Sequence, residues 1–136
     1  MKLCDTSVLV DIDRGDVADR VERLDDEGRH AISSVSVTEL RLGLNNRFGD
    51  HEPPSDVVTG LERLIARFEI IDVSRPIAVA AADIVTELER KGKPLHDLHD
   101  VYIAATAQTQ QLSVVTANVD HFDRIDDVDV VDWERF

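Results

Sequence analysis

The chain has 136 residues, of which 43% are hydrophobic, so it is long enough for one domain with a substantial core. Its formal net charge is −13, since 28 Asp and Glu residues outnumber 15 Lys and Arg residues. Such an acidic chain is ordinarily a poor partner for nucleic acid, whose phosphates attract basic residues. An acidic, lysine-poor composition is also typical of salt-adapted hosts, where salt screens distant repulsion. Composition alone therefore does not exclude RNA.

The sequence carries no sign of export or membrane insertion. No apolar stretch approaches the ~20 residues of a membrane span, and the N-terminus lacks the pattern of a signal peptide. The single cysteine, Cys4, cannot form an internal disulfide and lies in an apolar segment typical of a core. We therefore expect a reduced, cytoplasmic protein without a membrane partner.

Short apolar runs alternate with helical periodicities along the whole chain. In chain order, the first half predicts a strand at 2–4, helices at 6–13 and about 17–27, a strand at 30–33, a helix at 36–47 and, after a turn-rich connection at 49–54, a helix capped by Ser55. The second half predicts a strand at 69–73, helices at about 75–91 and 97–111, a strand at 112–116, a helical turn near 120–124 and a strand at 128–132. Strands alternating with helices indicate a single α/β domain over residues 1–136, a sandwich around a parallel sheet.

Three acidic residues lie in sequence that is otherwise typical of a core. Asp5 follows the apolar start of the chain, Glu39 lies in the helix expected at 36–47, and Asp100 opens an apolar helix. An isolated charge in a core costs several kcal/mol unless it is paired or bound to metal. Carboxylates that lie together repel each other, and a hard divalent cation relieves that repulsion. The pattern therefore indicates a metal site.

Polar residues also follow two of the expected strands. Sites in parallel sheets form beyond the carboxyl ends of strands, which is where Asp5, Asn118 and Asp120 are expected. Each has a simpler interpretation, because Asp favours helix N-caps and both Asn and Asp are common in turns. Their convergence with the other acids favours the functional interpretation.

Glu39 and Asp97 have structural interpretations of their own. Ser36-Val37-Thr38-Glu39 fits a capping box, in which the Glu side chain reaches back to the backbone N–H of the serine. From the first helical turn Glu39 can still point into the same pocket as Asp5. Asp97 and Asp100 are three residues apart and share a helix face. We expect Asp100 to be a metal ligand and Asp97 to cap the helix or support the site.

Four segments carry a family resemblance: Leu3-Cys4-Asp5-Thr6-Ser7, Ser36-Val37-Thr38-Glu39, Asp100-Val101-Tyr102-Ile103-Ala104-Ala105 and Val115-Thr116-Ala117-Asn118. In this order they resemble the PIN-domain ribonucleases, and more closely the VapC toxins of type II toxin–antitoxin systems. The resemblance spans nearly the whole chain and implies a PIN-like three-layer sandwich. It also implies an RNA substrate, a homodimer and inhibition by a cognate antitoxin.

The resemblance further implies Mg²⁺ or Mn²⁺ bound by Asp5 and Asp100, with Glu39 and a late acid completing the catalytic set. Family members often carry an acid directly before the late Phe, but here His121 holds that position and Asp120 precedes it. We take Asp120 as the fourth catalytic acid. We expect supporting roles for Thr6, Ser7, Asp97, Thr116 and Asn118.

These residues fit metal-assisted hydrolysis of a phosphodiester bond. In this interpretation the metal activates water and neutralises charge on the phosphate. Glu39 orients or deprotonates the water, and Asp120 supports a second metal. Candidates for RNA contact are Arg14, Arg41, Arg47, Lys91 and Lys93, and the apolar helix faces near 36–48 and 57–68 are candidates for an antitoxin groove.

Two alternatives remain open. Residues 8–13 superficially match the apolar run and Asp-x-Asp of haloacid-dehalogenase-like phosphatases, with Asp126 and Asp127 as a late acidic pair. Against this, Asp11 and Asp13 fall in an expected helix, and Arg14 follows where Thr or Val is expected. The other alternative is a PIN-like module that binds a partner and has weak or no nuclease activity. The intact set of acidic residues argues against this alternative.

Overall fold

The computed structural model describes residues 1–94 and 97–136. Within these residues the strands are β1 (Leu3–Cys4), β2 (Ala31–Ser33), β3 (Glu69–Ile71), β4 (Val114–Thr116) and β5 (Val130–Asp132). The helices are α1 (Thr6–Arg14), α2 (Ala18–Asp26), α3 (Ser34–Phe48), α4 (Ser55–Ile65), α5 (Arg75–Arg90), α6 (Leu98–Gln110) and α7 (Val119–Phe122), with a 3₁₀ helix η1 (Trp133–Arg135). None of these helices is both long and apolar enough to cross a membrane.

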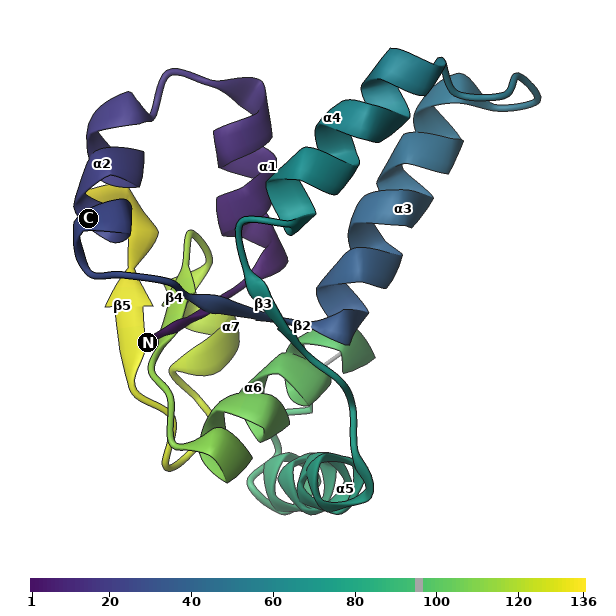
Figure 1. The fold of residues 1–136 in the computed structure, drawn as a ribbon. Coiled ribbons are helices and arrows are strands. Elements are labelled where there is room, and N and C mark those ends of the chain that lie inside the picture. Colours follow the sequence, from purple (N-terminus) through teal and green to yellow (C-terminus); the bar gives the residue numbers. More distant parts are fainter. Residues whose placement is uncertain (95–96) are drawn as a thin grey trace.

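The five strands form one sheet in the order β3-β2-β1-β4-β5, and every neighbouring pair is parallel (Figure 1). The central strand β1 pairs with β2 through Leu3 and Ala31, and with β4 through Cys4 and Val115. Because the strands are parallel, their carboxyl ends share one edge of the sheet. The backbone N–H of Asp5, just beyond β1, donates to the Val115 carbonyl at 2.9 Å, which places Asp5 beside Thr116.

Helices cover both faces of the sheet, because successive strand residues point to opposite faces. Leu3 and Val114 pack with α5 and α6 in one core. Cys4 and Val115 pack with α1, α2 and α4 in the other, which also contains the buried Trp133. Figure 1 shows α1, α2, α3 and α4 on one side of the sheet and α5 and α6 on the other. The sequence-based expectation of a three-layer α/β sandwich with a parallel sheet is confirmed.

Several element boundaries differ from the sequence-based expectation. Helix α3 begins at Ser34, two residues early, because the Ser33 side chain accepts a hydrogen bond from the Val35 N–H at 3.1 Å and caps the helix there. Helix α4 ends at Ile65, so Phe68 is buried from the following turn and not from the helix. Helix α5 agrees closely, with Ser74 as its N-cap and a proline in its first turn.

Candidate active site

Three carboxylates from separate elements meet at the carboxyl edge of the sheet. Asp5 follows β1, Glu39 projects from α3, and Asp100 lies in the first turn of α6. Asp5 is 4% exposed and Asp100 is 6% exposed, so both are buried acids. Asp5 lies close enough to the other two that its charge contributes to raising the pKa of Glu39 and of Asp100. The structure therefore brings together the three acids on which the sequence analysis rests.

Two hydroxyl groups hold the Asp5 carboxylate. Ser7 Oγ donates to Asp5 Oδ2 at 2.8 Å, and Thr116 Oγ1 donates to the same oxygen at 2.9 Å. The hydroxyls are held in turn by backbone N–H groups of the loop after β4, from Ala117 to Ser7 and from Asn118 to Thr116. Oδ1 of Asp5 accepts no hydrogen bond from a described residue, so one oxygen is oriented by the protein and the other is available to a ligand.

Thr6 holds Glu39 in the same way. Its Oγ1 donates to Glu39 Oε1 at 2.8 Å and also lies 2.8 Å from the buried hydroxyl of Ser36. The expected capping box is wrong, because α3 begins at Ser34 and Glu39 therefore lies beyond its first turn. Burial raises the pKa of Glu39, repulsion by Asp5 and Asp97 adds to the rise, and the Thr6 hydrogen bond and His99 oppose it.

Asp100 carries the clearest electrostatic perturbation in the site. Burial, followed by repulsion from Asp5 and Asp97, raises the pKa of Asp100 to about 6 from an ordinary 3.8. His121 opposes this shift, since its Nδ1 lies 2.8 Å from Asp100 Oδ2. His121 was not predicted as a site residue. The available signal was its place directly before Phe122, where the resembling family often carries an acid.

Asp97 is the N-cap of α6, in agreement with the sequence-based expectation. Its Oδ1 accepts the backbone N–H of His99 at 2.8 Å. The imidazole Nδ1 of His99 lies 3.4 Å from Asp97 Oδ1 and 3.7 Å from Glu39 Oε2. The sequence predicted no site role for His99, because its approach to Glu39 depends on how α6 packs beside α3.

Asp120 lies apart from these acids. It is exposed on α7 and lines an open hollow of about 300 Å³ with Asn118, His121, Asp132 and Glu134. Among the described residues, the charges that shift the pKa of Glu39 and of Asp100 include Asp5 and Asp97 but not Asp120. Its neighbour His121 is the residue of α7 that contacts Asp100. Only the backbone N–H of Asn118 takes part in the site. A catalytic role for Asp120 stays a prediction.

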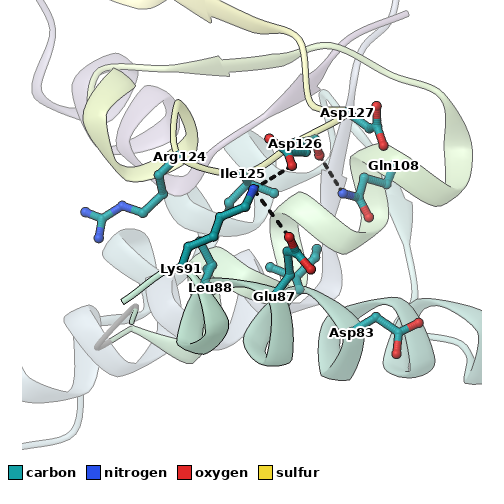
Figure 2. Close-up of a pocket in the computed structure, with 10 residues that line it drawn as sticks. Asp83, Glu87, Leu88, Lys91, Gln108, Arg124, Ile125, Asp126 and Asp127 are labelled. Carbon is teal, nitrogen blue, oxygen red and sulfur yellow. Dashed lines mark hydrogen bonds and ion pairs between the residues drawn. The ribbon is translucent and has the colours of Figure 1, made fainter. Parts of the chain in front are cut away.

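The acidic residues on which the phosphatase alternative depends form structural contacts elsewhere in the fold. Asp11 lies within α1 and accepts a hydrogen bond from Trp133 Nε1 at 3.1 Å. Asp126 and Asp127 line a hollow of about 270 Å³ between α5, α6 and the turn after α7 (Figure 2). There Lys91 Nζ lies 2.6 Å from Asp126 and 3.6 Å from Glu87. Figure 2 shows these ion pairs joining the turn to α5, and none of Asp5, Glu39 and Asp100 lines this hollow.

A larger groove of about 600 Å³ opens directly beside the acids, between α1, α3 and α4. Thr6 and Glu39 form part of its wall, so it is continuous with the site. Two of the predicted RNA-contact residues, Arg14 and Arg47, also line it. Its apolar lining comes from Val10, Leu40, Leu44, Val57 and Leu61. The two apolar helix faces predicted from the sequence therefore border one groove that reaches the site.

Residues 2–128 match the family model described as the PIN domain. The chain belongs to the PIN-domain family. Among curated proteins no match is found. This PIN domain is similar to solved structures of DNA-bound VapBC from Salmonella typhimurium (28% identity, TM-score 0.82, 98% of this chain and 99% of that chain) and of FitAcB from Neisseria gonorrhoeae (29% identity, TM-score 0.82, 100% of both chains).

It is also similar to VapBC2 from Rickettsia felis bound to a promoter DNA fragment (26% identity, TM-score 0.82, 97% of this chain and 98% of that chain). The similarity to VapC-type PIN toxins that the sequence indicated is therefore confirmed. Membership of this family removes the ground for the phosphatase alternative.

Proposed function

We propose that this PIN domain is a metal-dependent endoribonuclease and the toxin component of a type II toxin–antitoxin system. The observation that carries the proposal is the meeting of Asp5, Glu39 and Asp100 at one edge of the sheet, with the pKa of Asp100 raised to about 6. Three acids in a partly buried pocket repel one another, and a divalent cation offsets that repulsion. Perturbed carboxyl groups beside an open groove are typical of catalytic sites.

The donor set fits Mg²⁺ or Mn²⁺. Both ions prefer carboxylate oxygens, and Asp5 keeps one oxygen without a hydrogen bond from a described residue while Ser7 and Thr116 hold the other. In the proposal Asp5 and Asp100 hold the cation. When bound, the cation lowers the pKa of a coordinated water and offsets the charge of the phosphate.

The remaining steps belong to side chains of this chain. Glu39, held by Thr6, is positioned to orient the attacking water. His121 keeps the Asp100 carboxylate in place through its 2.8 Å contact. Asp120, exposed on α7, supports the site from its rim. RNA is the proposed substrate, with Arg14 and Arg47 at the groove as phosphate contacts.

The groove between α1, α3 and α4 also supports the antitoxin assignment. Its apolar lining, between helices that also carry Asp13, Arg14, Glu39 and Arg47, matches the apolar face of an amphipathic antitoxin helix. An occupant would cover Glu39 and exclude RNA. Two of the similar structures are VapBC complexes. We propose that a cognate antitoxin binds in this groove. We also propose that this chain forms a homodimer, and light scattering of the purified protein measures the mass that tests it.

RNA cleavage by the purified protein tests the nuclease assignment. We expect cleavage of a single-stranded RNA with Mn²⁺ or Mg²⁺, and its loss with EDTA or in Asp5→Asn. Asp83→Asn, an exposed acid on α5 away from the site, is the control and should cleave at the wild-type rate. Cleavage that persists in EDTA, or equal rates for Asp5→Asn and the control, would contradict the proposal. Cation binding without cleavage would favour the partner-binding alternative.

A further inference from the structure

We propose that His99 supplies a nitrogen ligand to a divalent transition-metal ion held together with Glu39 and Asp97, beside the buried carboxylates of Asp5 and Asp100. This role rests on the proposed function, because the ion serves the same metal-dependent site. It adds a ligand of a different chemical type to a pocket that the sequence predicts to be purely carboxylate. It also predicts a preference for Mn²⁺ over Mg²⁺.

The geometry of the three side chains carries the inference. One ligand atom from each lies within 4.8 Å of the other two. Ligand atoms about 2.0–2.2 Å from one ion lie about 3–4.4 Å apart, and the two distances from His99 Nδ1 fall in this range. The Nδ1 contacts of His99, at 3.4 Å to Asp97 and 3.7 Å to Glu39, are longer than ordinary N–H···O hydrogen bonds of about 2.7–3.2 Å. The three atoms therefore surround a gap instead of closing on each other.

Local structure holds two of these ligands in position. The cap of α6 joins Asp97 to His99, since Asp97 Oδ1 accepts the His99 backbone N–H at 2.8 Å. A carboxylate offers about four lone-pair sites on its two oxygens, so this single cap hydrogen bond leaves Asp97 able to bind an ion. Glu39 is fixed from the opposite side by Thr6. The His99 side chain is 43% exposed and that of Asp97 is 49% exposed, so an ion reaches them from solvent without any opening of the fold.

The imidazole decides which ion the position favours. Mg²⁺ takes oxygen ligands and keeps several waters, whereas imidazole nitrogen suits transition-metal ions, whose affinity for nitrogen and oxygen sites rises from Mn²⁺ towards Cu²⁺. A carboxylate pair with one imidazole therefore favours Mn²⁺ over Mg²⁺. Replacement of His99 by Gln removes the nitrogen and leaves the two carboxylates.

Pulsed electron paramagnetic resonance of the Mn²⁺-loaded full chain, without a histidine tag, tests the ligand directly. We expect ¹⁴N coupling from a histidine in the wild type and its loss in His99→Gln. His51→Gln is the matched control, because His51 is exposed in the loop after α3, and it should keep the coupling. Wild-type protein that binds Mn²⁺ without ¹⁴N coupling overturns the inference. Coupling that persists in His99→Gln also overturns it, because the nitrogen then comes from another residue such as His121.

Calorimetric titration with Mn²⁺ and Mg²⁺ gives a second readout. We expect His99→Gln to weaken Mn²⁺ binding at least about tenfold and Mg²⁺ binding about twofold or less. Equal losses for the two ions contradict the assigned preference. Failure of the proposed function gives a different result. A protein that shows ¹⁴N coupling but cleaves no RNA contradicts the nuclease proposal and leaves His99 as a metal ligand. Mn²⁺-dependent cleavage without coupling overturns the ligand assignment alone.

Discussion

The Nδ1 atom of His121 lies 2.8 Å from Oδ2 of Asp100, so the group that faces this buried carboxylate from α7 is an imidazole and not a further acid. The contact opposes the rise in the pKa of Asp100 that burial and neighbouring acids cause. Asp120, the residue before His121 on the same helix, is exposed. His121 therefore faces Asp100 at the position where the resembling family often carries an acid.

The raised pKa of Asp100 predicts how stability changes with pH. The folded protein binds a proton at Asp100 with a pKa of about 6, whereas the ordinary value is 3.8. This contribution to stability is fully present below the ordinary value and is lost as pH rises through about 6. We therefore expect the stability of wild type relative to Asp100→Asn to decrease from about pH 4 to pH 7, as measured by thermal denaturation of chelator-treated protein. A difference independent of pH would contradict the assignment.

His121→Asn should shift the pH dependence of metal binding upwards. The substitution removes a group that lowers the pKa of Asp100, so the proton competes with the cation up to a higher pH. Calorimetric titration with Mn²⁺ at several pH values measures the midpoint of this dependence in both proteins. His51→Asn serves as the control. An unchanged or lower midpoint in His121→Asn would show that the contact has no influence on Asp100.

Thr116→Val tests the hydroxyl that holds Asp5. Thr116 is fully buried and donates to Asp5 Oδ2 at 2.9 Å, while it accepts the Asn118 N–H. Loss of a buried hydrogen bond to a charged group costs about 1.5–3 kcal/mol, so we expect the free energy of unfolding to fall by that amount. Thr109→Val, at an exposed position on α6, should change it by about 0.5 kcal/mol or less. Equal effects in urea denaturation would argue against the contact.

Asp120→Asn should reduce RNA cleavage less than Asp5→Asn. Asp120 is exposed, whereas Asp5 is buried and contributes to the raised pKa of both Glu39 and Asp100. We expect a loss of about tenfold or less for Asp120→Asn and at least about a hundredfold for Asp5→Asn, since a metal ligand contributes several kcal/mol to the transition state. Equal losses measured on one RNA would place Asp120 among the metal ligands.

The net charge of −13 predicts a marked dependence of stability on salt. Repulsion across an acidic surface destabilises the compact state, and the Debye length falls from about 10 Å at 0.1 M to about 3 Å at 1 M salt. We expect the thermal midpoint in KCl to rise over this range. A midpoint that falls or stays constant would remove the reason to regard the surface as adapted to salt.

The strands, and the positions of Asp5 and Asp97 at the ends of regular elements, were predictable from sequence because local signals determine them. Asp5 follows an apolar strand, and Thr116 ends another, so parallel pairing of those strands places the two side chains together. Asp97 was predictable as a helix cap for a similar reason. The signal in each case lies within a few residues of the side chain concerned.

The histidines were not predictable in the same way. The approach of His99 to Glu39 depends on how α6 packs beside α3, and the approach of His121 to Asp100 depends on the rotation of the four-residue helix α7. The capping-box prediction failed because Ser33, at the end of β2, competed successfully with Ser36 as the cap of α3. A serine at a strand end and a serine at a helix start look alike in the sequence.

The rate of RNA cleavage by Asp100→Asn, compared with Asp83→Asn, tests the central claim most directly. Both substitutions remove one carboxylate charge, but only Asp100 lies in the buried group of acids, whereas Asp83 is exposed on α5. With saturating Mn²⁺ we expect Asp83→Asn to cleave at the wild-type rate and Asp100→Asn to lose at least about a hundredfold. Equal cleavage by the two variants would contradict a catalytic metal site built on Asp100.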